Sequence, residues 1–252
     1  MKILLDIQGA QTESRFRGIG RQTASLADAI IRNAGSHDVH ILLNHRLNES
    51  REELYRKYSQ VLPRSNIHIF QTPGGTAERH PENGWRTLAA EYIREHAIAR
   101  LSPDILHISS LFEGYVDDAV TSIGKLDVDY LTAVTLHDLI PLLDPKRYLA
   151  ELRPRRHWYR RAQFLKRADL LLSVSEHSKR EAIAHLAIPE NKVVVMSAGV
   201  EPDFRPTQPI NAYDADIHRK FDINRHFFLH VGSVDPRKNV EYIFQAFSKL
   251  KG

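Results

Sequence analysis

The chain has 252 residues, 42% of them hydrophobic and 26% charged, which is the balance of an ordinary globular protein. It contains no cysteine, so disulfide bonds, thiolate metal sites and a cysteine nucleophile are excluded. The formal net charge of +4 favours anionic ligands, but only weakly.

The first residues, MKILLDIQGAQ, carry an apolar run that ends at Asp6, which is too short for the hydrophobic core of a secretory signal. No stretch of the sequence approaches the length of a membrane-spanning helix. We therefore expect a cytoplasmic protein, with peripheral attachment to the inner face of the cell membrane as a further possibility.

Short apolar runs recur along the chain, as is typical of strands buried on both faces of a parallel sheet. They cover residues 2–7, 39–43, 67–70, 104–108, 130–136, 169–174 and 192–196. Helical spacing appears between them, as in the apolar stripe formed by Trp85, Leu88, Ala89, Tyr92 and Ile93. This alternation predicts an α/β domain with a doubly wound parallel sheet.

The alternation of strands and helices stops over residues 200–225. Prolines and acids there predict a hinge or linker after a first domain of residues 1–199. A strand over 226–231 and a helix over 240–250 then begin what we expect to be a second domain, residues 226–252. One strand and one helix bury too little apolar surface to form a domain. Either this strand and helix dock on the first domain, or the chain is a piece of a longer protein, and we expect the second.

The segment RGIGRQTASLADAI places Gly18 and Gly20 at the start of a predicted helix. It is not a dinucleotide-binding fingerprint, because Thr23 stands where the third glycine is required. The free N–H groups of a helix start, with arginines beside them, are suited to phosphate or carboxylate. The alternative is a bend that glycine permits, flanked by solvated arginines.

A second basic loop, GSVDPRKN, follows the strand expected at 226–231 and places Arg237 and Lys238 near the first turn of a helix. It lacks the glycine, lysine and hydroxyl pattern of a Walker A loop. The loop nevertheless has the elements of a phosphate site, which are a strand, a turn, two cations and the dipole of the following helix. The alternative is an ordinary turn with surface cations. Two such loops favour an anionic ligand held between two domains.

Six segments occur in order along the whole chain: RGIGRQTASLADAI, SPDILHI, TLHDLIPL, KRADLLLSVSEHSKREAI, VVVMSAGVEPDFRP and HVGSVDPRKNVEYIFQAF. Together they resemble the group 1 retaining nucleotide-sugar glycosyltransferases, glycosyltransferase family four, and in particular bacterial mannosyltransferases of surface polysaccharide synthesis. The resemblance implies a GT-B fold, in which two Rossmann-like domains face each other across the active site. Here it implies one complete acceptor domain and the start of a nucleotide-sugar domain.

The resemblance also implies roles for single residues. Gly18 and Gly20 are expected to face the donor diphosphate, and Arg237 and Lys238 to neutralise the leaving group. His137 is the expected catalytic residue beside the transferred sugar. Candidate acceptor contacts are Arg17, Asp138, Ser175 and Lys179. No metal or other cofactor is implied.

Some of these residues also have a structural interpretation. Asp138 is placed to cap a turn, and Ser178 and Glu181 have the spacing of a capping box, with Ser175 as an alternative cap. The basic stretch over 153–168 fits either a surface lying on anionic lipid or a solvated helix face, with Arg156, Arg160 and Arg167 outward. Nucleic acid is disfavoured as a partner, because no stacking aromatics accompany these cations.

The expected function is transfer of a hexose, mannose from GDP-mannose, to a growing surface polysaccharide or lipid-linked glycan. The alternative is a non-catalytic module that binds glycan or a partner, if these 252 residues are the whole product. A nucleotide-sugar epimerase is disfavoured by the RGIGR and PRKN segments.

Overall fold

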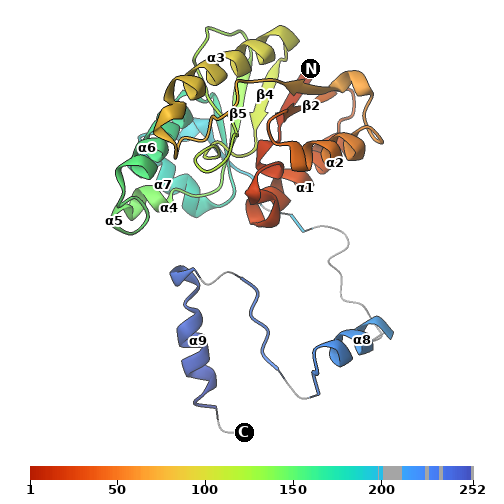
Figure 1. Cartoon of the computed structure of the whole chain (residues 1–252), viewed down its shortest axis with the longest axis vertical. Coiled ribbons are helices and arrows are strands. Elements are labelled where there is room, and N and C mark those ends of the chain that lie inside the picture. The colour runs from red at the N-terminus through yellow and green to blue at the C-terminus, as the bar shows by residue number, and fades with distance from the viewer. Residues whose placement is uncertain (198, 201–211, 225–226, 233–234, 251–252) are drawn as a thin grey trace. The chain divides into compact units, whose positions relative to one another are not determined.

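The computed structural model describes residues 1–197, 199–200, 212–224, 227–232 and 235–250 (Figure 1). These residues belong to two compact units, Met1–Val200 and Glu201–Gly252. Each unit is described by itself below.

The first unit is built on a parallel sheet of seven described strands in the order β3-β2-β1-β4-β5-β6-β7. The strands are β1 (Lys2–Asp6), β2 (Asp38–Asn44), β3 (Ile67–Phe70), β4 (Ile105–Ile108), β5 (Leu131–Leu136), β6 (Leu170–Ser173) and β7 (Val193–Val195). All seven coincide with the apolar runs of the sequence, so the predicted parallel α/β sheet is confirmed. The strand order reverses direction between β1 and β4.

Helices cover both faces of this sheet (Figure 1). They are α1 (Gly18–Arg32), α2 (Asn48–Tyr58), α3 (Gly84–Leu101), α4 (Ile140–Leu143), α5 (Pro145–Tyr148), α6 (Leu152–Arg167) and α7 (Glu176–Leu186). Successive strand residues point to opposite faces, so Leu4 and Leu5 enter different cores. Leu5 packs with residues of α1 and α2, and Leu4 packs with residues of α3, α6 and α7. The predicted double winding is therefore confirmed.

Helix α3 is oriented opposite to the usual amphipathic pattern. Its apolar stripe faces outward, with Trp85 65% and Leu88 46% exposed, and Tyr92 and Ile93 are exposed as well. The buried side instead carries Thr87, Glu91, Arg94 and Glu95, together with Ala90 and Ile98. The hydrophobic spacing correctly predicted a helix, but its ordinary implication, that the stripe packs on the core, is wrong.

A buried ion pair explains part of this orientation. Arg94 Nε donates to Asp6 Oδ2 over 2.9 Å, and its Nη1 donates to the carbonyl of Ser122 over 3.1 Å. Both Arg94 and Asp6 are almost completely buried. Gln8 Nε2 donates to Asp6 Oδ1 over 3.1 Å, which satisfies the second carboxylate oxygen. A buried charge is tolerated only when it is paired and hydrogen-bonded, so the end of β1 and α3 are joined by this contact.

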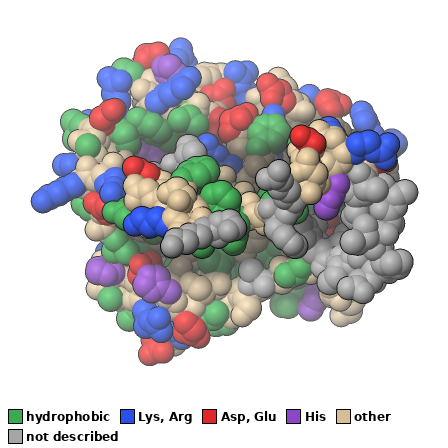
Figure 2. Space-filling model, turned by 90° about the horizontal axis from the view of Figure 1, so that it is seen from below, with side chains coloured by type: hydrophobic (Ala, Val, Ile, Leu, Met, Phe, Trp, Pro, Cys, Tyr) green, Lys and Arg blue, Asp and Glu red, His purple; other side chains and the backbone are tan. Residues whose placement is uncertain are grey.

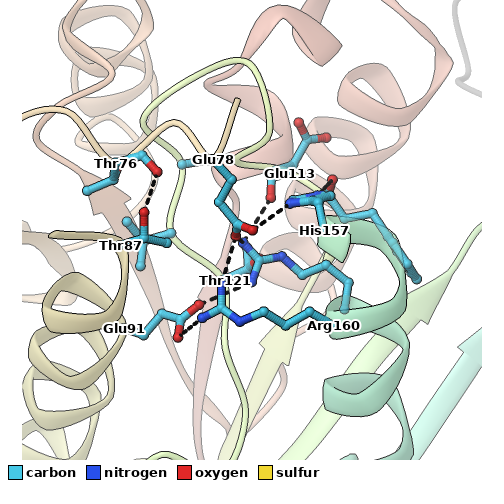
Figure 3. A network of polar contacts seen from close by, with 12 residues as sticks. Thr76, Glu78, Thr87, Glu91, Glu113, Thr121, His157 and Arg160 are labelled. Atoms are coloured by element: carbon cyan, nitrogen blue, oxygen red, sulfur yellow. Dashed lines mark hydrogen bonds and ion pairs between the residues drawn. The ribbon is translucent and has the colours of Figure 1, made fainter. Parts of the chain in front are cut away.

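A second charged network joins α3 to α6 (Figure 3). Glu91 on α3 bonds Arg160 and Arg161 on α6, with 3.2 Å between Arg161 Nη1 and Glu91 Oε1. Glu78 accepts from both arginines, over 2.7 Å from Arg161 Nη2 and 3.0 Å from Arg160 Nη1. His157 Nδ1 lies 3.3 Å from Glu78 Oε2. Arg160 was expected to point outward and instead belongs to this network, where it pairs with Glu78 and Glu91 alongside Arg161.

The other residues of α6 are partly exposed and partly packed against the rest of the first unit. Arg156 and Arg167 are exposed as expected, while Ala162 and Leu165 are buried and Trp158 stacks on Phe112 at 4.4 Å between ring centroids. On the face seen in Figure 2, lysine and arginine side chains are interspersed with acidic ones. No helix in the described part of the chain is long and apolar enough to cross a membrane.

The second unit contains α8 (Ala212–Lys220), a 3-10 turn over Pro236–Lys238 and α9 (Val240–Phe247). The helix expected over 240–250 is present in shortened form. The strand expected over 226–231 is not formed in the described residues 227–231, because a strand needs a partner ladder and the described part of this unit supplies none. Part of the predicted hinge, residues 201–211, lies outside the described residues. That this unit begins a second Rossmann-like domain stays a prediction.

The network around Glu78 generates a testable pH dependence. Burial alone would raise the pKa of Glu78, but the contact with His157 and the charges of Arg161 and Arg160 hold the pKa at about 2, below its ordinary value of 4.5. The carboxylate therefore stabilises the fold above about pH 4.5 and loses that effect as the pH falls toward about 2. Glu78→Gln should lower the free energy of unfolding by about 3 kcal/mol at neutral pH, since Arg160 and Arg161 then share Glu91 as their acidic partner among the described residues.

Urea denaturation of the two proteins at a series of pH values measures this difference. The difference should shrink as the solution is acidified below about pH 4.5. Glu53→Gln, at an exposed position on α2, is the matched control and should show no such trend. A difference that stays constant with pH would contradict the assignment.

Candidate functional site

The carboxyl ends of the central strands meet at one edge of the sheet, where open parallel α/β sheets bind their ligands. Hydrogen bonds link these ends in sequence. Ser109 Oγ, just after β4, donates to the carbonyl of Asp6 at the end of β1 over 2.8 Å. His137, just after β5, contacts the carbonyl of Ser109 through Nε2 at 3.0 Å. Ser178 on α7 donates through Oγ to the carbonyl of His137 over 2.9 Å. His137 and the start of α7 are therefore brought together.

The start of α1 lies at the same edge, since Gly9 after β1 is in close contact with Ser110 after β4. A Cβ atom on Gly9 would lie 2.9 Å from Ser110 Cβ and 2.9 Å from Thr23 Oγ1 on α1. Arg17 is the N-cap residue of α1 and makes no side-chain capping bond. The amides of the first turn therefore have no cap from that side chain, as the predicted anion site requires.

The two glycines of this helix start differ in their surroundings. A Cβ on Gly20 would lie 2.3 Å from Arg15 Cα and 2.3 Å from the Ser14 carbonyl oxygen, so no side chain fits there. A Cβ on Gly18 would meet nothing within 4 Å. Gly20 thus allows close packing of α1 on the preceding turn, whereas Gly18 is at an open position. Contact with a diphosphate stays a prediction for both.

Arg17 and Arg15 have different environments beside this helix start. Arg15 donates to Glu49 over 2.6 Å and to the carbonyl of Gln11 over 3.0 Å, which holds it against the turn. The Arg17 side chain is exposed, with no hydrogen-bond or ion-pair partner among the described residues. Arg17 is thus available to an acceptor or a phosphate.

His137 is half-buried, and desolvation by that burial lowers its pKa. The ring is therefore neutral near pH 7. With the Nε2 hydrogen directed at the Ser109 carbonyl, the neutral ring leaves Nδ1 as an acceptor. That arrangement suits a hydrogen bond from a sugar hydroxyl.

Three candidate acceptor contacts lie near His137 in structural roles. Asp138 accepts through Oδ1 from the amide of Ile140 over 3.1 Å, so the turn-capping interpretation is realised. Ser175 is the N-cap of α7 and accepts from the amide of Ser178 over 3.1 Å. Ser175, the alternative cap, is therefore the one that caps α7, and the Ser178 hydroxyl donates to the carbonyl of His137. Lys179 Nζ lies 3.5 Å from Glu190.

Arg237 and Lys238 lie in the second unit, in the 3-10 turn before α9. Arg237 forms a fork on Asp235, with Nε 3.0 Å from Oδ1 and Nη2 2.8 Å from Oδ2. The hydrogen bonds from Arg237 are the main reason that the pKa of Asp235 falls to about 2. Lys238 is exposed. The two basic loops belong to different units, and their meeting around one ligand stays a prediction.

Two features of the first unit were not predicted from the sequence. Glu113, in the loop after β4, accepts hydrogen bonds from three hydroxyl groups beside the start of α1. Ser178 was assigned to a cap and instead positions His137. The signal for Glu113 was its place after the strand at which the sheet order reverses. Among the described residues, no group of three or more histidine or acidic side chains is arranged to hold a metal ion.

A pocket of about 270 Å³ lies away from these residues. It is lined by residues 122–124 and 126–132 with Leu106, Arg167 and Asp169. Leu131 and Thr132 are at the amino end of β5, opposite to His137. The pocket is therefore not part of the candidate site.

Comparison with known proteins identifies the family. The model of Glycosyltransferase Family 4 matches residues 16–204, and the chain belongs to that family. A serotype-specific mannosyltransferase WbdA of Escherichia coli is 35% identical over 251 residues, which is 99% of this chain and 30% of the relative. A second WbdA from Escherichia coli is 33% identical over 226 residues, covering 89% of this chain and 28% of the relative. The chain thus spans less than a third of the length of these relatives.

Two solved structures are similar at low sequence identity. A glycosyltransferase from Rickettsia africae is 14% identical with a TM-score of 0.48, covering 89% of this chain and 50% of that one. Arabidopsis thaliana UGT89C1, complexed with UDP, is 10% identical with a TM-score of 0.47, covering 89% of this chain and 55% of that one.

The contrast between the two glycines of α1 is directly testable. Gly20→Ala should lower the free energy of unfolding by about 2 kcal/mol, because the added methyl group overlaps backbone atoms of the preceding turn. Gly18→Ala is the matched variant and should stay within about 0.5 kcal/mol of the unmodified protein, since its methyl group meets open space. Thermal unfolding followed by circular dichroism measures the change in stability of each variant. Equal effects of the two substitutions would contradict this assignment.

Proposed function

We propose that this protein is a nucleotide-sugar-dependent glycosyltransferase that retains anomeric configuration. The proposed donor is GDP-mannose, and the proposed acceptor is a growing surface polysaccharide or lipid-linked glycan. Family membership across residues 16–204 is the observation that carries the proposal. The sugar is inferred from the relatives named mannosyltransferase.

In the proposed reaction the acceptor oxygen bonds the anomeric carbon while the bond from that carbon to the diphosphate oxygen breaks. The acceptor proton passes to a phosphate oxygen of the leaving group. Negative charge develops on the diphosphate, where the amides at the start of α1 and the cations Arg237 and Lys238 would stabilise it. The proposal therefore needs no metal ion.

His137 would act beside the transferred sugar, accepting a hydrogen bond through Nδ1 from one of its hydroxyls. Its Nε2 contact with Ser109 and the Ser178 bond to its carbonyl hold the residue in place. Such a contact positions the sugar for reaction and does not bind the nucleotide. Arg17, Asp138, Ser175 and Lys179 would contact the acceptor at the same edge of the sheet.

We also propose that the protein works in the cytoplasm, against the inner face of the membrane that carries its acceptor. The exposed cations of α6, such as Arg156 and Lys166, support this proposal, since they suit anionic lipid. Arg160 and Arg161 contribute less, because Glu78 and Glu91 already pair with them.

The phosphate assignment predicts the effect of removing each cation. In the full-length gene product, Lys238→Ala and Arg237→Ala should each lower transfer of labelled mannose from GDP-mannose by about 100-fold, because each removes fixed charge from the leaving group. Lys220→Ala, at an exposed lysine of α8, is the matched control and should transfer normally. Near-normal rates in both variants would rule out this phosphate site. A folded protein that binds glycan but transfers nothing would favour the binding-module alternative.

The role of His137 predicts a different kinetic pattern. His137→Ala should reduce kcat by about 10-fold or more while the dissociation constant for GDP changes little, since the ring is placed beside the sugar. Steady-state rates and titration with GDP measure the two quantities separately. A parallel loss of GDP affinity would instead place His137 at the diphosphate.

A further inference from the structure

Glu113 is a half-buried acid that the proposed reaction does not use. Three hydroxyl groups donate to its carboxylate: Ser14 to Oε1 over 2.8 Å, Ser110 to Oε1 over 2.9 Å and Thr12 to Oε2 over 3.0 Å. Figure 3 shows Glu113 at the edge of the charged network of α3 and α6. Its carboxylate thus joins the turn before α1 to the end of β4.

Glu113 is held by hydroxyl groups and not by a cation. Asp6, Glu78 and Glu91 each pair with an arginine, whereas Glu113, like the buried Glu95, has no ion-pair partner in the described part of the chain. Burial raises the pKa of Glu113 and Asp117 raises it further, while the hydrogen bonds from Ser14, Ser110 and Thr12 oppose this change. Removing a carboxyl group from part of its water without a cation is costly, and the hydrogen bonds from the three hydroxyls offset that cost.

The turn held by Glu113 carries the start of α1. Thr12 caps that turn, Glu13–Phe16, by accepting from the amide of Ser14 over 3.2 Å. The close approach of Gly20 to the backbone of Ser14 and Arg15 then seats the first turn of α1 on it. A shift of Ser14 would therefore move the α1 amides.

The other side of Glu113 is anchored in the fold. Gly114 has a φ of +92°, and a Cβ there would lie 2.4 Å from the Ala119 carbonyl oxygen, so the loop is tightly closed. Arg161 Nη2 lies 3.4 Å from the carbonyl oxygen of Glu113. Glu113 thus connects a rigid part of the unit to the turn.

We propose that Glu113 is a positioning residue, which fixes the turn Glu13–Phe16 and through it the α1 amides that bind the donor diphosphate. The inference rests on the proposed function for its ligand, but the positioning itself can be measured without one. Glu113 acts through Ser14 and Gly20 and does not touch the substrate.

Hydrogen exchange of the full-length protein without ligand tests the positioning. Glu113→Ala removes the acceptor of all three hydroxyls, so a peptide spanning residues 12–21 should exchange on the order of 10-fold faster. Glu113→Gln keeps one acceptor oxygen and adds an N–H that can donate to Thr12, so it should restore protection to within about 3-fold. Glu53→Ala is the matched control. Unchanged exchange in Glu113→Ala would overturn the inference, whatever the activity.

Titration with GDP and with UDP links the turn to the site. Glu113→Ala should raise the dissociation constant of the bound nucleotide about 10-fold, because preorganisation of the α1 amides is lost. Glu113→Gln should stay within about 3-fold, since geometry and not charge is required. Ser14→Ala combined with Glu113→Ala should add little to the single loss, because both remove the same bond. A lowered melting temperature without any change in affinity would indicate a merely structural role and overturn the inference, as would a Gln variant as weak as the Ala variant.

Lys238→Ala separates this inference from the proposed function. If the unmodified protein binds neither nucleotide, the proposed function fails, and the diphosphate part of the inference fails with it. If it binds one of them and Lys238→Ala weakens binding while Glu113→Ala does not, the proposed function stands and the inference alone is overturned.

Discussion

The contact between Asp6 and Arg94 is the constraint on which the rest of the first unit depends. Both side chains are buried where β1 ends, and neither charge is tolerable there without the other. Arg94 can reach Asp6 only if α3 turns its charged side to the sheet. Glu91 and Glu95 then enter the interior as well, and Glu91 draws Arg160 and Arg161 of α6 inward. This ion pair and the contacts of Glu91 thus help to fix the orientation of α3 and α6.

The same pair lies at the edge where the candidate site forms. The carbonyl of Asp6 accepts a hydrogen bond from the Ser109 hydroxyl, and the carbonyl of Ser109 accepts one from the His137 ring. The carbonyl of His137 accepts a third from the Ser178 hydroxyl. These bonds use backbone carbonyls as acceptors, so each strand end is fixed directly to the next. Side chains held in this way keep a single orientation, which the proposed role of His137 beside a sugar requires. The charged interior and the site are therefore parts of one arrangement.

The sheet was well predicted because strands buried on both faces must be apolar along their whole length. Every run from Lys2 to Met196 became a strand, although the edge strands β3 and β7 leave Ile69 and Val194 exposed. The side of α3 that faces the core was not predicted, since the spacing of apolar residues shows a stripe but not the charges that a neighbouring element presents to the helix. His137 was found through a motif at a strand end. Glu113 was missed because a loop residue has no periodicity and its three partners come from distant segments.

The sequence by itself determined the parallel α/β fold of the first unit and the membership of a glycosyltransferase family, while for the cap of α7 it left Ser175 as an alternative to Ser178. These follow from local patterns of apolar and polar residues and from ordered motifs. Only the tertiary structure decided which charges are buried, why Gly20 must be glycine and which groups surround His137 and Glu113. The reason is physical: the cost of burying a charge or a methyl group depends on what lies opposite, and that is known only once the chain has folded.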